Sequence, residues 1–333
     1  MISNLSRRSD PASAKTAFPL GSFGPRLRLA SIVALGFLPG TARACACGCG
    51  VFEVGTSSMF PEGAGSTAFA EFDFQDQNHD WSGTSEAPAA NNPDKDIRTS
   101  FLTLGYQVVF NRSWGIRFDL PYERRLLRTT GGATGADIVS LNFRGPGDVR
   151  VQGIYTGLSP DLSTGLTFGL KLPTGGSAAN DAFGDIDRDS EIGTGSTDVL
   201  LGGYRRFNLE TDYGWSGFVQ GEFDVPILTR GQYRPGAELD AAFGAYYSGW
   251  SIGRARVTPV AQLKVSVRAR DTGANAASPV ASGYERALLA PGIELSLHPF
   301  KLYADVERPV YQRYTGNQLA APALYKLELS FMF

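Results

Sequence analysis

The feature that most constrains the fold is a period-two alternation of apolar and polar residues that recurs from Thr67 to the end of the chain. In residues 67–75 every even position is alanine or phenylalanine, and Glu71, Asp73 and Gln75 lie between them. Successive residues of a β-strand point to opposite faces, so each such segment has one apolar and one polar face. The sequence therefore predicts an all-β protein.

Twelve segments continue this alternation, at 66–77, 97–110, 114–127, 146–158, 162–174, 196–208, 214–226, 236–250, 255–269, 284–297, 300–312 and 322–333. Short turns between them alternate with long connections rich in Gly, Asn, Asp and Ser, at 78–96, 128–145, 175–195, 227–235, 270–283 and 313–321. A soluble β-sandwich also alternates, but its solvent face would hold few large aromatic residues. Long strands joined in this way predict a transmembrane antiparallel β-barrel of about 12 strands, with short periplasmic turns and long outer loops.

The first segment has the order of parts of a secretory signal peptide. Arg26 and Arg28 precede an apolar stretch at 29–38, and Ala42-Arg43-Ala44 supplies small residues at a cleavage site. A short buried helix is the alternative. We expect a signal peptide at 1–44, a Cys-rich periplasmic segment at 45–64 and the barrel at 65–333, in the bacterial outer membrane after Sec-dependent export.

Charge and cysteine usage exclude several classes of protein. Removal of the predicted signal peptide takes six basic residues from 31 and one acidic residue from 33, and leaves a mature net charge of -7. This balance gives no electrostatic reason to expect nucleic acid as a partner. All three cysteines lie within 45–49, so disulfides do not hold the body of the chain together. No run of about 18 apolar residues that could form a membrane-spanning helix occurs in the sequence.

The last segment ends in an aromatic residue. Residues 325, 327, 329, 331 and 333 form one apolar face, which closes on Phe331 and Phe333. This ending resembles the assembly signal of bacterial outer-membrane barrels. It implies the barrel assembly machinery as a partner, besides outer-membrane lipid, lipopolysaccharide and a small-molecule solute.

Three short motifs resemble an outer-membrane barrel family associated with the meta-cleavage pathway of phenol degradation, a group of transporter-like proteins. They are Leu170–Gly175, Gly145–Val149 and Gly195–Val199, the last of which continues into Leu200–Phe207. The resemblance implies a barrel fold, the outer membrane and the passage of small molecules, aromatic ones among them.

The polar face of each strand predicts the side chains that line the lumen. Their signs are mixed, so we expect ion pairs and a narrow path rather than one strong field. These residues are Glu71, Asp73, Arg117, Asp119, Asp148, Arg150, Lys171, Asp198, Arg206, Glu222, Asp224, Lys264, Arg268, Glu294, Asp305 and Glu307. The sequence predicts a channel or transporter for small solutes, aromatic or hydrophobic compounds among them. The alternative is a non-conducting structural barrel that anchors the Cys-rich segment.

Enzyme chemistry is not expected. The chain has two histidines, His79 in a predicted outer loop and His298 in a predicted periplasmic turn. A Ser-His hydrolase in the barrel wall would need a histidine on a strand beside a serine. Neither histidine fits, and no catalytic residue is predicted.

Metal binding is the first hypothesis for Cys45, Cys47 and Cys49, because their small spacers let three sulfurs converge on Cu or Zn. Lipidation of Cys45 and mixed disulfides with a periplasmic partner are the alternatives. The outer loops are acidic, notably at 185–191, and a solvated acidic loop is the first interpretation. Ca²⁺ that bridges these carboxylates to lipopolysaccharide is the alternative. No other cofactor is predicted.

Overall fold

The structure is a computed structural model. It describes residues 60–333, except 62, 132–136, 178–179, 182–183, 186–187, 210–213, 248–249 and 274–280. The predicted signal peptide and the three cysteines lie outside the described residues, so both remain predictions.

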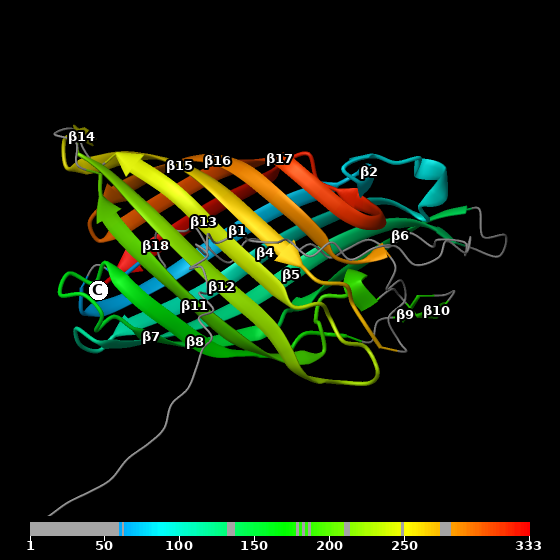
Figure 1. Ribbon diagram of the computed structural model, residues 1–333, viewed down its shortest axis with the longest axis horizontal. Helices are drawn as coiled ribbons and strands as arrows, with labels where there is room; N and C mark the ends of the chain where they lie inside the picture. Colours follow the sequence, from blue (N-terminus) through cyan, green and yellow to red (C-terminus); the bar gives the residue numbers. More distant parts are fainter. Residues whose placement is uncertain are drawn as a thin grey trace, which may run out of the picture. The chain divides into compact units, whose positions relative to one another are not determined.

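The described chain forms a closed antiparallel β-barrel of 12 strands, as the sequence predicts (Figure 1). Each strand pairs with the next along the chain, and β18 closes the wall on β1, where Asp73 is opposite Lys326. The strands are β1 (Gly65–Gln77), β4 (Asp94–Val109), β5 (Trp114–Gly131), β7 (Val149–Tyr155), β8 (Thr164–Leu172), β11 (Ser196–Asn208), β12 (Trp215–Thr229), β13 (Glu238–Tyr247), β15 (Ala255–Arg268), β16 (Tyr284–Leu297), β17 (Phe300–Ala320) and β18 (Leu324–Met332).

The two ends of the barrel differ. At one end, which we call the short-turn end, the chain turns at 110–113, 156–163, 209–214, 248–254 and 298–299, and the C-terminus lies there (Figure 1). The opposite end, the long-loop end, carries the longer connections, except that residues 321–323 alone join β17 to β18. The longer connections hold β2 (His79–Gly83), β3 (Ser85–Glu86), β6 (Asp137–Pro146), β9 (Asn180–Asp181), β10 (Gly184–Asp185) and the 3-10 helices η2 (Ala89–Asn91) and η3 (Arg188–Ser190), whereas β14 (Trp250–Ile252) lies at the short-turn end.

Two connections expected to be loops are partly strand. β5 continues to Gly131 and pairs with β6, and β17 continues to Ala320 instead of ending at 312. The backbone ladder needs only paired N–H and C=O groups, so it continues after the alternation has stopped, with β17 paired to β2 there. Among the residues that the structure describes, no helix is long and apolar enough to cross a membrane.

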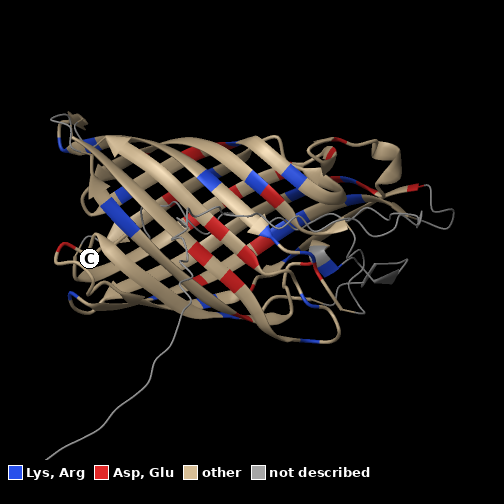
Figure 2. Cartoon of the chain, viewed as in Figure 1, with Lys and Arg blue, Asp and Glu red and all other residues tan. Residues whose placement is uncertain are grey.

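The alternation places apolar side chains outside and polar side chains inside. On β18, Leu327 and Leu329 are 46% and 49% exposed, whereas Lys326 and Glu328 between them are 3% and 1% exposed. Figure 2 shows charged residues set apart along the strands by uncharged ones. This is the inverse of a soluble barrel, whose apolar side chains fill the interior.

Aromatic side chains gather at the short-turn end. The ring centroids of Trp114 and Tyr155 are 4.8 Å apart, and those of Trp215 and Tyr247 are 5.4 Å apart. Trp and Tyr prefer the membrane–water interface, because their rings are apolar and their N–H or O–H groups are polar. The place of Tyr303 near a strand end predicts the same interface, but this residue is 2% exposed and lies on the inner face.

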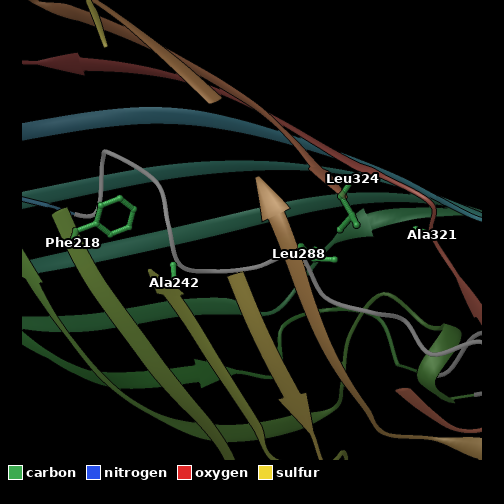
Figure 3. Close-up of a cluster of buried hydrophobic side chains, with 5 residues drawn as sticks. All are labelled: Phe218, Ala242, Leu288, Ala321 and Leu324. Atoms are coloured by element: carbon green, nitrogen blue, oxygen red, sulfur yellow. The ribbon is translucent and has the colours of Figure 1, made fainter. Parts of the chain in front are cut away.

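Apolar residues also meet inside the barrel. One buried cluster contains Phe218 of β12, Ala242 of β13, Leu288 of β16, Leu324 of β18 and Ala321 between β17 and β18 (Figure 3). At the long-loop end Leu319 packs with Ile97 and Leu127. Parts of the interior are therefore filled by side chains rather than by water.

Candidate channel interior

The sixteen residues predicted to line the lumen all lie on the inner faces of their strands or at strand ends, and all are buried or half-buried. The structure brings most of them into ion pairs. These pairs fall into two groups, one beside the β18–β1 closure and one on the wall formed by β7, β8, β11 and β12.

The group near the closure is packed away from water. On β15, the ammonium nitrogen of Lys264 is 3.2 Å from a carboxylate oxygen of Asp305 and 2.6 Å from one of Glu307. Both acids belong to β17, so the contacts pass over the intervening β16. On β18, Lys326 is 2.9 Å from Glu71 and 3.3 Å from Asp73.

Arg117 and Asp119 continue this group along β5. The Nε of Arg117 donates a hydrogen bond of 2.9 Å to the Asp119 carboxylate. The same guanidinium carbon lies 4.7 Å from the centroid of the Phe69 ring. An aromatic face and a carboxylate thus hold one buried cation in place.

The second group reaches across the interior. Arg150 of β7 donates a hydrogen bond of 3.0 Å to Glu222 of β12, although β8 and β11 separate these strands in the wall. Arg150 is also 3.5 Å from Asp224. Lys171 is 2.8 Å from Asp224 and pairs with Asp198. Side chains of both signs on this wall therefore reach over the intervening strands and occupy part of the interior at this level.

Asp148 has a different role from its neighbours. Its carboxylate accepts hydrogen bonds of 2.9 Å from the Gly175 N–H and 2.8 Å from the Thr194 N–H. Thr174 in turn donates a hydrogen bond of 2.8 Å to the Gly147 carbonyl. The motifs Gly145–Val149 and Leu170–Gly175 thus meet at one corner, where Asp148 fixes the loop between β8 and β11.

Glycine is required at this corner by close approach. A Cβ on Gly193 would lie 2.5 Å from the carbonyl carbon of Gly175. The same loop is held over the interior by Arg125, which donates a hydrogen bond of 2.9 Å to the Glu191 carbonyl. Arg188 donates a hydrogen bond of 3.0 Å to the Glu191 carboxylate.

Cavities lie at both ends of the interior. The long-loop cavity has a volume of about 150 Å³, and Arg150, Lys171, Glu222 and Asp224 are among its lining residues. The short-turn cavity is larger, about 620 Å³, and its lining residues include Arg206, Phe218 and Tyr303. A neighbouring cavity of about 480 Å³ shares Phe60, His298, Lys301 and Met332 with it.

Buried side chains separate the two cavities. On β12, Phe218 lines the short-turn cavity and Glu222 lines the long-loop cavity. Gln220, the inward residue between them, is buried and lines neither. On β13, Ala242 lies in the same way between Asp240 and Tyr246. Buried side chains therefore occupy the interior between the two cavities at this level.

Residues 60 and 61, at the start of the described chain, occupy the short-turn end. The Phe60 ring packs between Tyr204 and Phe218, at centroid distances of 5.2 and 5.3 Å. Arg206 donates a hydrogen bond of 3.1 Å to the Pro61 carbonyl. Sequence reasoning missed this contact, because residues 60 and 61 precede the first alternating strand and carry no periodic signal.

The remaining predicted sites are not brought together. His79 begins β2 at the long-loop end, and His298 lies in a turn at the other end. Within the described ranges, no three His, Cys, Asp or Glu side chains are grouped so that they could hold a metal ion. Several residues of the acidic loop at 185–191 fall outside those ranges. The calcium and cysteine hypotheses thus remain predictions.

The comparisons with known proteins support the fold. No family model and no curated protein matches the sequence. The COG4313 outer membrane channel from Pseudomonas putida F1 has a TM-score of 0.64 and 13% sequence identity, over 84% of this chain and 100% of that chain. The beta domain of the Bordetella autotransporter BrkA has a TM-score of 0.48 and 14% identity, over 81% of this chain and 100% of that chain. The CymD monoaromatic hydrocarbon channel has a TM-score of 0.43 and 10% identity, over 81% of this chain and 89% of that chain.

The first of these likenesses shows a shared barrel fold. The closed wall pairs the backbone groups of every barrel strand, as hydrocarbon surroundings require, and its outer face is apolar. The barrel is therefore an outer-membrane β-barrel of the bacterial type. Membership of the phenol-degradation family is not shown by these comparisons and remains a prediction.

Proposed function

We propose that the protein is an outer-membrane channel that passes small solutes through its charge-lined interior. The observation that carries this proposal is the pair of cavities at the two ends of one closed barrel, with side chains of both signs along the long-loop cavity. Long loops face outward and short turns face the periplasm in barrels of this kind. A solute would enter past the loop that Asp148 fixes and leave past Phe60.

Eight of the sixteen predicted charged residues border the two cavities and line the path in this proposal: Asp148, Arg150, Lys171, Arg206, Glu222, Asp224, Arg268 and Glu294. Arg150, Lys171, Glu222 and Asp224 form the narrow outer part, where a solute meets both signs of charge. A small polar or amphipathic molecule suits such a wall, because it can exchange hydrogen bonds with paired side chains at each step. A large solute does not, because the layer at Gln220 and Ala242 is packed.

A non-conducting barrel is the second candidate function, and the packed layer favours it. In that case the barrel anchors the N-terminal segment, with Phe60 and Pro61 as the attachment point. Cys45, Cys47 and Cys49 would then present a Cu or Zn site or a partner-binding site at the periplasmic face. Phe331 and Phe333 would serve assembly in either case, and the acidic loops would contact lipopolysaccharide through Ca²⁺.

Liposome swelling distinguishes the two functions. Vesicles that contain the refolded protein should swell in small sugars and amino acids faster than protein-free vesicles do. The Arg124→Gln variant should swell equally fast, because Arg124 is exposed on the outer face. Swelling no faster than that of empty vesicles would remove the channel proposal and leave the anchoring barrel.

A further inference from the structure

The short-turn cavity combines aromatic walls with an excess of positive charge. Its volume of about 620 Å³ falls in the range of roughly 300–1,000 Å³ that is usual for small-molecule sites. Phe60, Phe218, Tyr246 and Tyr303 supply aromatic surface. Sites of this type bind flat apolar groups and use a few polar side chains to fix their orientation.

Basic side chains dominate the charge of this cavity. Arg206, Arg254, Arg256 and Lys301 line it, and Glu294 is the carboxylate among the lining residues. Glu294 accepts a hydrogen bond of 2.7 Å from Ser296. Among the described residues, neither Arg254 nor Arg256 has an acidic partner in an ion pair. Figure 2 shows basic residues on strand ends at this end of the barrel.

Arg206 is held in place while part of its guanidinium stays unpaired. One terminal nitrogen donates hydrogen bonds of 3.1 Å to the Pro61 carbonyl and 3.4 Å to the Leu162 carbonyl. Its Nε is buried and has no hydrogen-bond partner. A guanidinium that is oriented by backbone carbonyls and lines a cavity is suited to receive a carboxylate through its terminal N–H groups.

Phe60 shows that the cavity wall accepts an aromatic ring beside this cation. Its ring contacts Tyr204 and Phe218, and the guanidinium carbon of Arg206 is 5.9 Å from its centroid. A phenyl group of a ligand would meet the same surroundings on the open side of Phe60, against Tyr246 and Val260. The Phe60 ring thus shows how an aromatic ring lies next to the Arg206 guanidinium in this cavity.

The long-loop cavity has the opposite balance. Its lining contains more acidic than basic residues, with Glu123, Asp148, Glu191, Glu222, Asp224, Glu238 and Asp240 against Arg125, Arg150, Lys171, Arg188 and Arg268. Most of these charges already form ion pairs with one another. Affinity for an anion should therefore be concentrated at the short-turn end.

We propose that the short-turn cavity binds a small aromatic monoanion, with its carboxylate on Arg206 and Arg256 and its ring against Phe60, Phe218 and Tyr246. This inference rests on the proposed channel function, which it deepens by naming the class of solute. Two guanidinium groups give charge-assisted hydrogen bonds to a carboxylate, and the aromatic side chains give face and edge contacts to its ring.

Calorimetric titration of the detergent-purified protein tests the site with benzoate as the probe. Benzoate should bind, and benzyl alcohol, benzylamine and acetate should each bind at least about tenfold more weakly, because each lacks the ring or the negative charge. Arg206→Gln should weaken benzoate binding by about tenfold or more. Arg205→Gln is the matched control, because Arg205 precedes it on β11 and is exposed on the outer face.

A second variant works in the opposite direction. Glu294→Gln removes the carboxylate that lines the cavity, so it should tighten benzoate binding. This test holds even where Arg206→Gln fails to fold. The inference is overturned if benzoate binds no more tightly than benzyl alcohol, if Arg205→Gln weakens binding as much as Arg206→Gln, or if Glu294→Gln leaves the affinity unchanged.

Conductance of the same preparation separates this inference from the proposed function. Ion conduction without benzoate binding would overturn the site and leave the channel. Benzoate binding without conduction or swelling would support the site and contradict transport through the barrel.

Discussion

Lys264 and Glu307 form an ion pair of 2.6 Å inside the barrel, with side chains that are 0% and 1% exposed. Lys264 also contacts Asp305, so one cation lies between two buried carboxylates from the second strand along the wall. A buried charge is tolerated only when partners replace the lost water. The arrangement makes this part of the interior a fixed wall rather than a path.

Replacement of Lys264 by methionine should destabilise the barrel by about 3–5 kcal/mol, because Asp305 and Glu307 lose the cation that compensates their burial. The exposed pair of Arg313 and Glu285, at 59% and 44%, provides the control. Arg313→Met should cost no more than about 1 kcal/mol. Denaturant unfolding of the liposome-inserted protein measures both, and equal losses would show that burial of the first pair has no energetic consequence.

Gly105 gives a second test of packing in the interior. A Cβ at Gly105 would lie 1.8 Å from the end of the Phe69 ring, which occupies the space opposite it on β1. Gly105→Ala should therefore cost about 1–3 kcal/mol through overpacking. Gly176→Ala is the control, because nothing lies within 4 Å of its added Cβ. If Phe69→Ala is already present, Gly105→Ala should cost much less, and an undiminished cost would refute the steric explanation.

The charges of the narrow outer part should set ion selectivity. Arg150→Gln removes the cation that faces Glu222 and Asp224, so the wall becomes more negative. We expect the reversal potential in a KCl gradient to shift toward cation preference. Arg144→Gln is the control, because Arg144 is exposed on β6, which lies outside the barrel proper. A shift of the same size for both variants would mean that Arg150 does not border the ion path.

Phe60 should limit flow at the short-turn end. Phe60→Ala removes the ring from between Tyr204 and Phe218, and we expect larger current steps because the two neighbouring cavities then merge. Phe207→Ala alters a ring that is exposed on the outer face, so its current steps should equal those of the unmodified protein. Smaller or unchanged steps for Phe60→Ala would be incompatible with this role.

The alternation of residues made the strands and their inner faces predictable. On β18 a shift of one residue would exchange Lys326 for Leu327 at the inner face, so the pattern admits only one assignment. Tyr303 could have been placed inside by the same reasoning, since it shares the parity of Lys301 and Asp305. Its position near a strand end was the weaker indication.

Other features could not be predicted, because they depend on contacts between distant parts of the chain. Parity shows that Arg150 and Glu222 point inward, but only the closure of the barrel shows that they meet. Phe60 lies in a segment without alternation, and its partners are on β11 and β12. The extension of β17 to Ala320 was missed because residues 313–320 do not alternate, although backbone pairing with β2 continues the strand.

Single-channel recording in planar lipid bilayers is the most direct test of the central claim, that the barrel conducts through its charge-lined interior. The purified protein should give discrete current steps above the lipid background, and Arg150→Gln should change their ion selectivity. A complete absence of steps, for both the unmodified protein and Phe60→Ala and with correct folding shown by heat-modifiable migration, would contradict the claim.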